Sequence, residues 1–147
     1  MRINILCVDL DDTISDYPGW EGEGYKIVNG KPMTGVQETI DTLRNEGWLV
    51  LVYSTRCNFK GGVVATAKFL EDNGIRVDGV CFNKPPADIY LDDKGMTFDG
   101  NWSGMLEKIR SFKTWKKLQE IECQNSQKQL TELPQASKPS SPVSGKG

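Results

Sequence analysis

The stretch Ile3-Asn4-Ile5-Leu6-Cys7-Val8-Asp9-Leu10-Asp11-Asp12-Thr13 decides the fold of this chain. Its first part, up to Val8, is apolar and rich in branched side chains, which predicts a buried β-strand. Three carboxylates follow within four positions, at Asp9, Asp11 and Asp12. Carboxylates crowded beside an apolar strand repel one another and are costly to bury. A divalent cation with oxygen ligands would offset this charge; the alternative is an acidic turn exposed to solvent.

The composition is that of an ordinary globular protein. The chain has 147 residues, enough for one domain with a core, of which 37% are hydrophobic and 26% charged. A net charge of −2 indicates no basic face, so we expect no duplex nucleic-acid scaffold as a partner. No apolar run approaches the length of a membrane span, and the N-terminus has no signal-peptide pattern. We therefore expect no membrane partner.

The cysteine pattern and the absence of histidine restrict the possible chemistry. The cysteines are Cys7, Cys57, Cys81 and Cys123; none forms a C-x-x-C pair, and the chain has no histidine. A zinc site is therefore not expected, and the pattern is typical of a reducing, cytoplasmic protein. Without histidine, acid–base chemistry is left to carboxylates, Lys, Tyr or Cys.

Apolar runs and helical periods alternate along the rest of the chain. The predicted elements are strands at 48–53, 80–82, 89–91 and, as a short edge strand, 97–98, and helices from a capping-box pattern at 34–37 to Gly47, over 63–72, and over 101–122. This alternation predicts an α/β fold, a Rossmann-like parallel sheet with flanking helices. In such sheets, sites form beyond the carboxyl ends of the strands.

Two segments have a different character. Residues 15–32 are rich in Gly and aromatic residues and predict a loop with a small hairpin, either a flap over the carboxylates or a plain surface loop. Residues 123–147 are rich in Ser, Gln, Lys and Pro, which predicts a disordered polar tail after a domain at 1–122. The last predicted helix carries an apolar stripe that is expected to pack in the core. Its members are Met105, Leu106, Ile109, Phe112, Trp115, Leu118 and Ile121.

Each predicted strand ends in residues suited to binding a phosphate or a metal. In chain order they are Asp9 with Asp11, Ser54 with Arg56, Lys84, and Asp92 with Asp93. A parallel sheet brings the carboxyl ends of its strands to one edge. Chance explains one such group, but four in succession are hard to explain as solvated loop ends.

In this order, the residues resemble the motifs of the haloacid dehalogenase superfamily, specifically its aspartate-nucleophile phosphatases. The four matching motifs are D-x-D-x-T at 9–13, S/T-x-R at 54–56, Lys-Pro at 84–85 and the acidic pair at 92–93. The ordered set is strong evidence, whereas the first motif alone is only moderately specific. The resemblance covers about residues 2–122. Many members have Gly in place of Asp12, and many have Gly-Asp in place of the acidic pair.

The resemblance implies a Mg²⁺-dependent phosphomonoester hydrolase. Asp9 is the implied nucleophile, forming an aspartyl-phosphate, and Asp11 the general acid and base. Mg²⁺ would bind Asp9, the backbone carbonyl of Asp11 and Asp92. Asp93 is implied either as a further ligand or as support for Asp92.

The same resemblance implies a phosphorylated substrate, a small molecule or a polymer end. Ser54 would donate a hydrogen bond to the phosphate, beside Thr55, and Lys84 would supply a fixed positive charge. Arg56 would bind a second anionic group on the substrate, and the alternative for it is a surface salt bridge. Many members carry a cap domain; the gaps here leave no room for one, which indicates a capless form with a short flap. Oligomer formation is left open.

Three other functions share part of this pattern. A receiver domain of a response regulator also combines acidic residues, Ser/Thr and Lys-Pro on a parallel sheet, but it would need its phospho-accepting Asp near Ser54. A catalytically silent metal- and phosphate-binding module of the same fold is a second alternative. A phosphotransferase, which passes the phosphoryl group to an acceptor other than water, is a third.

Overall fold

The computed structural model describes residues 3–19 and 24–131. The chain divides into two units, residues 1–100 and 101–147. The first unit contains β1 (Ile5–Val8), β2 (Ser15–Asp16), η1 (Gly24–Lys26), β3 (Lys31–Pro32), α1 (Val36–Asn45), β4 (Leu49–Tyr53), η2 (Thr55–Asn58), α2 (Gly62–Asp72), β5 (Gly79–Cys81) and β6 (Ile89–Leu91). The second unit contains α3 (Met105–Ser111) and α4 (Trp115–Thr131).

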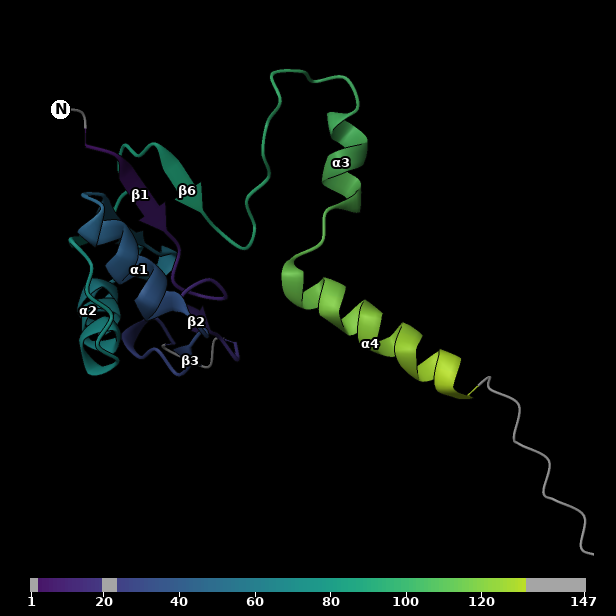
Figure 1. Ribbon diagram of the computed structural model, residues 1–147, viewed down its shortest axis with the longest axis horizontal. Coiled ribbons are helices and arrows are strands. Elements are labelled where there is room, and N and C mark those ends of the chain that lie inside the picture. Colours follow the sequence, from purple (N-terminus) through teal and green to yellow (C-terminus); the bar gives the residue numbers. More distant parts are fainter. Residues whose placement is uncertain (1–2, 20–23, 132–147) are drawn as a thin grey trace, which may run out of the picture. The chain divides into compact units, whose positions relative to one another are not determined.

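The first unit is built on a four-stranded parallel sheet in the order β5-β4-β1-β6. Figure 1 shows β1 and β6 as neighbouring arrows that point the same way. The register aligns Cys7 of β1 with Leu51 of β4 and with Tyr90 of β6. The predicted α/β fold, a Rossmann-like parallel sheet with flanking helices, is confirmed.

The core lies on one face of this sheet. Because β1, β4 and β5 follow one another in the same direction across the sheet, right-handed crossovers place α1 and α2 on the same face. The buried core consists of Leu6, Val8, Leu10, Ile14, Ile40, Val50, Val52, Phe69, Leu70 and Ile75. Leu10 and Ile14 are fully buried. They anchor the chain directly after β1, so the intervening carboxylates stay at the edge of the sheet.

The connection from β5 to β6 is short and crosses the sheet. Residues 82–88 must pass β4 and β1, three strand spacings of about 4.8 Å each or about 14 Å in all. A parallel crossover with a helix needs a dozen or more residues, so this one is a loop. It runs in the direction opposite to the first two crossovers, which places it on the face that α1 and α2 leave open.

The segment 15–32, called the flap from here on, differs in its described part from the expected hairpin. Its strands are β2 and β3, which pair antiparallel, with Ser15 opposite Pro32 and Asp16 opposite Lys31. Tyr25 lies in the 3-10 turn η1 instead of in a strand.

Two local predictions are wrong. No capping box forms at 34–37: Gly35 precedes α1 with φ of +83°, a left-handed conformation that suits glycine, and no side chain caps the helix. Among the described residues, 97–98 do not form a strand. After β6 the chain turns away in loops, so β6 is the edge of the sheet.

The second unit also differs from the predicted helix. The single helix expected at 101–122 is interrupted at Phe112, whose φ of −57° and ψ of 134° are not helical. The apolar stripe therefore does not keep one face, and four members expected in the core are exposed: Leu106, Ile109, Phe112 and Leu118. The helix α4 continues to Thr131, past the expected end at 122, through a stretch with three Gln and one Lys, which favour helices. The domain boundary at 122 stays a prediction, and residues 132–147 lie outside the described part.

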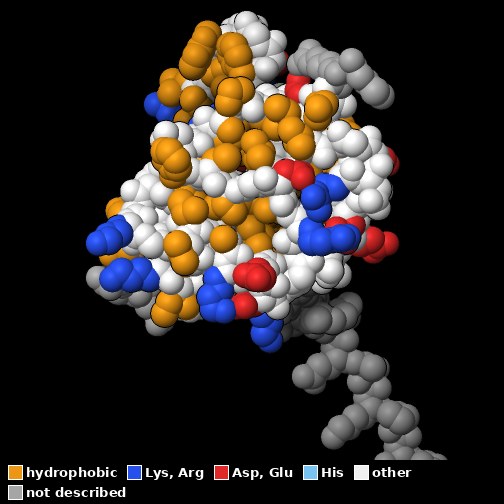
Figure 2. Space-filling view, turned by 90° about the vertical axis from the view of Figure 1, so that its left-hand side faces the viewer, with side chains coloured by type: hydrophobic (Ala, Val, Ile, Leu, Met, Phe, Trp, Pro, Cys, Tyr) orange, Lys and Arg blue, Asp and Glu red, His pale blue; other side chains and the backbone are white. Residues whose placement is uncertain are grey.

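The surface has a mixed character. On the side that Figure 2 shows, hydrophobic side chains gather over the middle of the face, and Lys and Arg stand beside Asp and Glu at its margins. In the described part of the chain, no helix has both the length and the apolar character that a membrane span requires.

Candidate functional site

The register of the sheet brings the acidic residues together. Val8 and Leu91 are aligned as the last residues of β1 and β6, and the amide of Asp9 donates a hydrogen bond of 2.9 Å to the carbonyl of Leu91. The residues that follow the two strands are therefore neighbours. Carboxylate oxygens of Asp9, Asp92 and Asp93 all lie within 4.8 Å of one another.

Asp93 provides the test of whether a metal ion fits. Its side chain is 2% exposed, and its Oδ2 lies 3.4 Å from the Nζ of Lys94. Its Oδ1 is buried without a hydrogen-bond partner. A buried acceptor without a partner is costly. Three carboxylates with one buried oxygen unsatisfied are the hard oxygen donors that Mg²⁺ takes, so the residues fit this ion.

The electrostatics of the cluster agree with this fit. The pKa of Asp9 is raised from 3.8 to about 7, chiefly by burial and also by the nearby charges of Asp92, Asp11 and Asp93, while a hydrogen bond from the Leu10 amide lowers it. Burial also raises the pKa of Asp93, while the Lys94 ammonium opposes the shift. Without a cation, the fully ionised cluster is therefore disfavoured in the folded protein.

The carboxylates are carried on a tight turn. The carbonyl of Leu10 accepts hydrogen bonds from the amides of Ile14 and Ser15, at 3.0 and 2.8 Å. Asp12 has φ of +64°, the one positive φ at a non-glycine residue in the described part of the chain. Glycine adopts this left-handed conformation without the steric cost that a side chain brings. The Oδ1 of Asp12 accepts the amide of Tyr17 at 3.1 Å.

Asp11 is held in a separate interaction, with Arg56. The Nε of Arg56 lies 3.0 Å from Oδ1 and 2.8 Å from Oδ2 of Asp11, and its Nη2 lies 2.8 Å from Oδ1. The Arg56 side chain is fully buried, and that of Asp11 is 14% exposed. The Asp11 side chain thus belongs to this ion pair and lies outside the Asp9–Asp92–Asp93 group.

Arg56 also holds the flap. Its Nη1 donates a hydrogen bond of 2.8 Å to the carbonyl of Ile27, and its Cζ lies 4.8 Å from the centre of the Tyr17 ring. The salt bridge predicted as one alternative for Arg56 is present, but it is buried instead of at the surface. The Ile27 acceptor is a main-chain atom, so no residue type in the sequence signals it.

Ser54 lies next to this ion pair. It is 1% exposed, and its Oγ lies 3.4 Å from Oδ2 of Asp11. The same Oγ accepts the amide of Arg56 at 3.4 Å and caps η2. Thr55, the first residue of η2, is exposed. The second predicted motif is thus adjacent to the first.

Lys84 contacts an aromatic ring and forms no ion pair with the carboxylates of the described residues. Its Nζ lies 4.1 Å from the centre of the Tyr90 ring, and the Tyr90 hydroxyl donates a 2.6 Å hydrogen bond to the carbonyl of Pro85. Within the described ranges, Lys84 has no ion pair with a carboxylate. The reason is topological, because the loop 82–88 crosses the sheet and carries Lys84 over β6.

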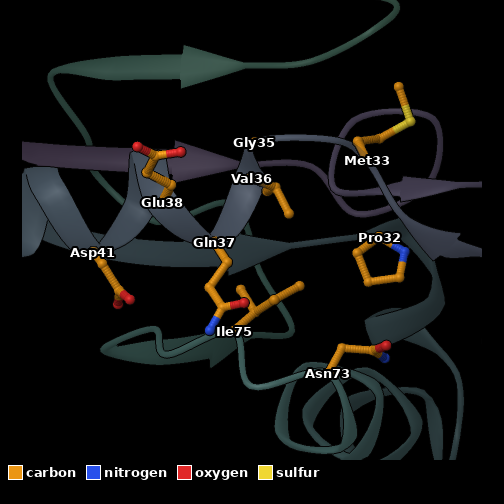
Figure 3. A pocket seen from close by; sticks show the side chains of 9 residues that line it. All are labelled: Pro32, Met33, Gly35, Val36, Gln37, Glu38, Asp41, Asn73 and Ile75. Carbon is orange, nitrogen blue, oxygen red and sulfur yellow. The ribbon is translucent and has the colours of Figure 1, made fainter.

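A cavity lies apart from this site. It has a volume of about 410 Å³ and contains none of the predicted site residues. Figure 3 shows it between the first turns of α1, with Gln37, Glu38 and Asp41, and the end of α2, with Asn73 and Ile75 beyond it. Asp41 is engaged by Arg76 at 3.0 Å. The cluster of Asp9, Asp92 and Asp93 therefore lies at the sheet edge and not in this cavity.

Comparison with known proteins adds little to the assignment. A scan against models of protein families finds no match, and neither does a search of curated proteins. Among solved structures, a chain of the Pnkp1/Rnl/Hen1 RNA repair complex is similar, with a TM-score of 0.44 and 20% sequence identity. The similarity covers 71% of this chain, which spans 29% of the length of that one. The functional assignment therefore depends on the site itself.

Proposed function

We propose that this protein is a Mg²⁺-dependent phosphomonoester hydrolase with Asp9 as its nucleophile. The observation that carries the proposal is the convergence of Asp9, Asp92 and Asp93 at the carboxyl ends of β1 and β6, with one buried oxygen of Asp93 unsatisfied. Asp11 and Ser54 lie beside this cluster as a second polar pair. A carboxylate cluster and a separate Asp11 carboxylate, each with its own environment, suit a division between metal binding and acid–base work.

Asp9, Asp92 and Asp93 would hold Mg²⁺, together with water and a phosphate oxygen. The bound ion offsets the repulsion between an anionic nucleophile and an anionic phosphate. It also favours ionised Asp9, which burial opposes in the metal-free protein.

The proposed reaction has two steps. An Asp9 carboxylate oxygen attacks phosphorus, the bond to the leaving oxygen breaks, and Asp11 gives that oxygen its proton. Water then attacks the phosphorus of the aspartyl-phosphate, Asp11 takes its proton, and inorganic phosphate leaves as Asp9 is regenerated. One difficult displacement is thereby replaced by two easier ones.

Ser54 connects substrate binding to Asp11. A carboxylate offers about four lone-pair sites; Arg56 occupies those of Asp11 with three contacts, and the Ser54 hydroxyl lies at the remaining one at the longer distance of 3.4 Å. A substrate phosphate that accepts from Ser54 Oγ would free one lone pair of Asp11 Oδ2, while the other stays with the Arg56 Nε. The acid–base site would then open where the substrate binds.

The test is phosphate release from a broad panel of phosphate esters, with Mg²⁺ or with EDTA. Asp9→Asn is expected to lose at least 1000-fold in kcat with its fold retained, because the amide cannot act as the nucleophile. The matched control is Asp72→Asn, at an exposed residue that pairs with Lys68, and it is expected to keep full activity. Retained turnover in Asp9→Asn would exclude the nucleophile assignment.

The position of Lys84 favours a second candidate. Because Lys84 contacts the Tyr90 ring and forms no ion pair with a described carboxylate, a metal- and phosphate-binding module of the same fold without turnover is the alternative. It predicts Mg²⁺ binding with no release from any ester. A phosphotransferase would instead show release that added alcohols divert into new esters.

A further inference from the structure

We propose, on the basis of the function above, that Arg56 is a positioning residue that couples the flap to the carboxylate of Asp11. The coupling rests on one guanidinium that contacts Asp11 on one side and the flap on the other. It would make the orientation of the acid–base residue depend on whether the flap is seated.

The three nitrogens of the guanidinium divide between the two partners. Nε and Nη2 contact both oxygens of Asp11, and Nη1 contacts the carbonyl of Ile27. An arginine fork is planar and rigid, so movement of one arm moves the others. The Tyr17 ring, 4.8 Å from Cζ, packs against the guanidinium. Two flap positions thus fix the plane in which Asp11 is bound.

The burial of Arg56 makes this arrangement costly to break. Its side chain is 0% exposed, and separating a buried ion pair leaves an uncompensated charge. Ile27 is 64% exposed, so this flap residue is held through its main-chain carbonyl and not by apolar packing. Loss of the Asp11 contact is therefore expected to loosen the flap at a residue that Asp11 does not touch.

The chain provides a matched pair for comparison. Arg44 binds Asp78 in the same side-on geometry, with Nε at 3.1 and 3.2 Å and Nη2 at 2.8 Å from the carboxylate. The two side chains are 30% and 22% exposed. This pair joins α1 to the start of β5 and is not part of the site. The same substitutions there test the loss of an arginine fork without any effect on the flap.

Trypsin provides a local readout, because it cleaves the Lys26–Ile27 bond next to the held carbonyl. We expect Asp11→Asn and Arg56→Lys to raise the initial cleavage rate at this bond at least fivefold. Cleavage at Lys113–Thr114, between α3 and α4, is the internal reference and is expected to be unchanged. Arg44→Lys and Asp78→Asn are expected to leave both rates unchanged. Cleavage at Lys26–Ile27 that stays at the wild-type rate in Asp11→Asn would overturn the coupling.

Kinetics separate a positioning role from general stabilisation. Lysine keeps the charge of Arg56 but cannot bridge Asp11 and Ile27 as a fork. Arg56→Lys is therefore expected to lower kcat at least tenfold with KM and Mg²⁺ affinity within threefold, whereas Arg44→Lys changes none of them. Wild-type kcat in Arg56→Lys would contradict the proposal. If Arg56→Lys does not fold, Asp11→Asn, which is nearly isosteric, still decides the proteolysis result.

The two proposals fail in different ways. If the wild-type protein releases no phosphate from any ester, the phosphatase assignment fails, while the cleavage rate at Lys26–Ile27 still decides the coupling. If the protein is an active phosphatase and Asp11→Asn leaves the cleavage rate unchanged, the coupling fails and the phosphatase assignment stands.

Discussion

The amide of Asp9 donates a hydrogen bond of 2.9 Å to the carbonyl of Leu91, which sets the ends of β1 and β6 at the same level. This one contact makes Asp9 and Asp92 neighbours although 82 positions separate them in the sequence. The acidic cluster is therefore a consequence of strand register, and its charge is a cost that the fold carries. The first two predictions follow from that cost.

The stability of the metal-free protein is expected to fall as pH rises from 4 to 7. The pKa of Asp9 is raised from 3.8 to about 7 in the folded state, so the folded protein holds a proton that the unfolded chain has lost. The associated stability is complete below about pH 4 and is lost as pH approaches 7. The pKa of Asp93 is raised as well and acts in the same direction. A pKa difference of one unit between the folded and unfolded states corresponds to about 1.4 kcal/mol of unfolding free energy. We therefore expect Tm to fall by about 10 °C between pH 4 and pH 7.

Thermal melts in EDTA from pH 4 to 8 measure this dependence. The pKa of Asp78 is lowered by the Arg44 hydrogen bonds, so its contribution is lost only towards and below pH 4, outside the window. Asp9→Asn is expected to flatten the curve, and saturating Mg²⁺ to reduce its fall, because both remove the cost of ionised Asp9. A Tm that rises between pH 5 and 7 in EDTA would show that burial of Asp9 does not control the pH dependence of stability.

Asp93 is expected to contribute directly to Mg²⁺ affinity, although Asp92 is the residue that immediately follows the strand. Its Oδ1 is buried without a partner, whereas Oδ1 of Asp92 already accepts the amide of Lys94 at 2.7 Å. We expect Asp93→Asn to weaken Mg²⁺ binding by about 10- to 100-fold, the range found for losing a supporting carboxylate. Isothermal titration measures the Mg²⁺ affinity of Asp93→Asn and of Asp92→Asn. Unchanged affinity in Asp93→Asn, with a loss only in Asp92→Asn, would assign the metal to Asp92 and Asp9 alone.

The sheet follows from the sequence because its strands are short, apolar and branched, and strand period and length determine them. What the sequence does not determine is capping and termination. Gly35 replaces the expected side-chain cap by a left-handed backbone. Phe112 ends α3 although the apolar period continues past it. Helical periodicity describes side-chain spacing, not the backbone angles at one residue.

The candidate site also contains residues whose positions the sequence predicts and one, Lys84, whose position it does not. Residues that directly follow strands, such as Asp9 and Asp92, are placed by register and are predictable from the strands. Lys84 follows β5, but it lies on a loop whose path depends on which strand comes next. Because β6 is on the far side of β1, the loop takes Lys84 across the sheet. Strand order depends on the whole topology, which local sequence does not contain.

Asp12 is expected to tolerate glycine but not valine. Its φ of +64° costs an ordinary side chain about 1–2 kcal/mol, which Asp12→Gly relieves at the loss of the acceptor for the Tyr17 amide. We therefore expect Asp12→Gly to lie within about 1 kcal/mol of the wild type and Asp12→Val to be destabilised by about 2 kcal/mol. Urea denaturation in EDTA measures both. If both variants have the same stability, the backbone conformation at Asp12 does not control this turn.

Replacing Gly62 by a larger residue is expected to destabilise the protein, because α2 begins in direct contact with η2. A Cβ at this buried position would collide with the carbonyl carbon and oxygen of Arg56 and approach the amide of Cys57. Main-chain atoms cannot give way as a side chain does, so Gly62→Ala is expected to cost about 3 kcal/mol. The displaced backbone is that of Arg56, so cleavage by trypsin at Lys26–Ile27 is expected to rise as well. Gly95→Ala is the control for stability, since its Cβ would meet Asp92 only at an ordinary 3.6 Å. Wild-type stability in Gly62→Ala would mean that α2 can move away from η2 without cost. The contact with Gly62 would then not fix the main chain of Arg56.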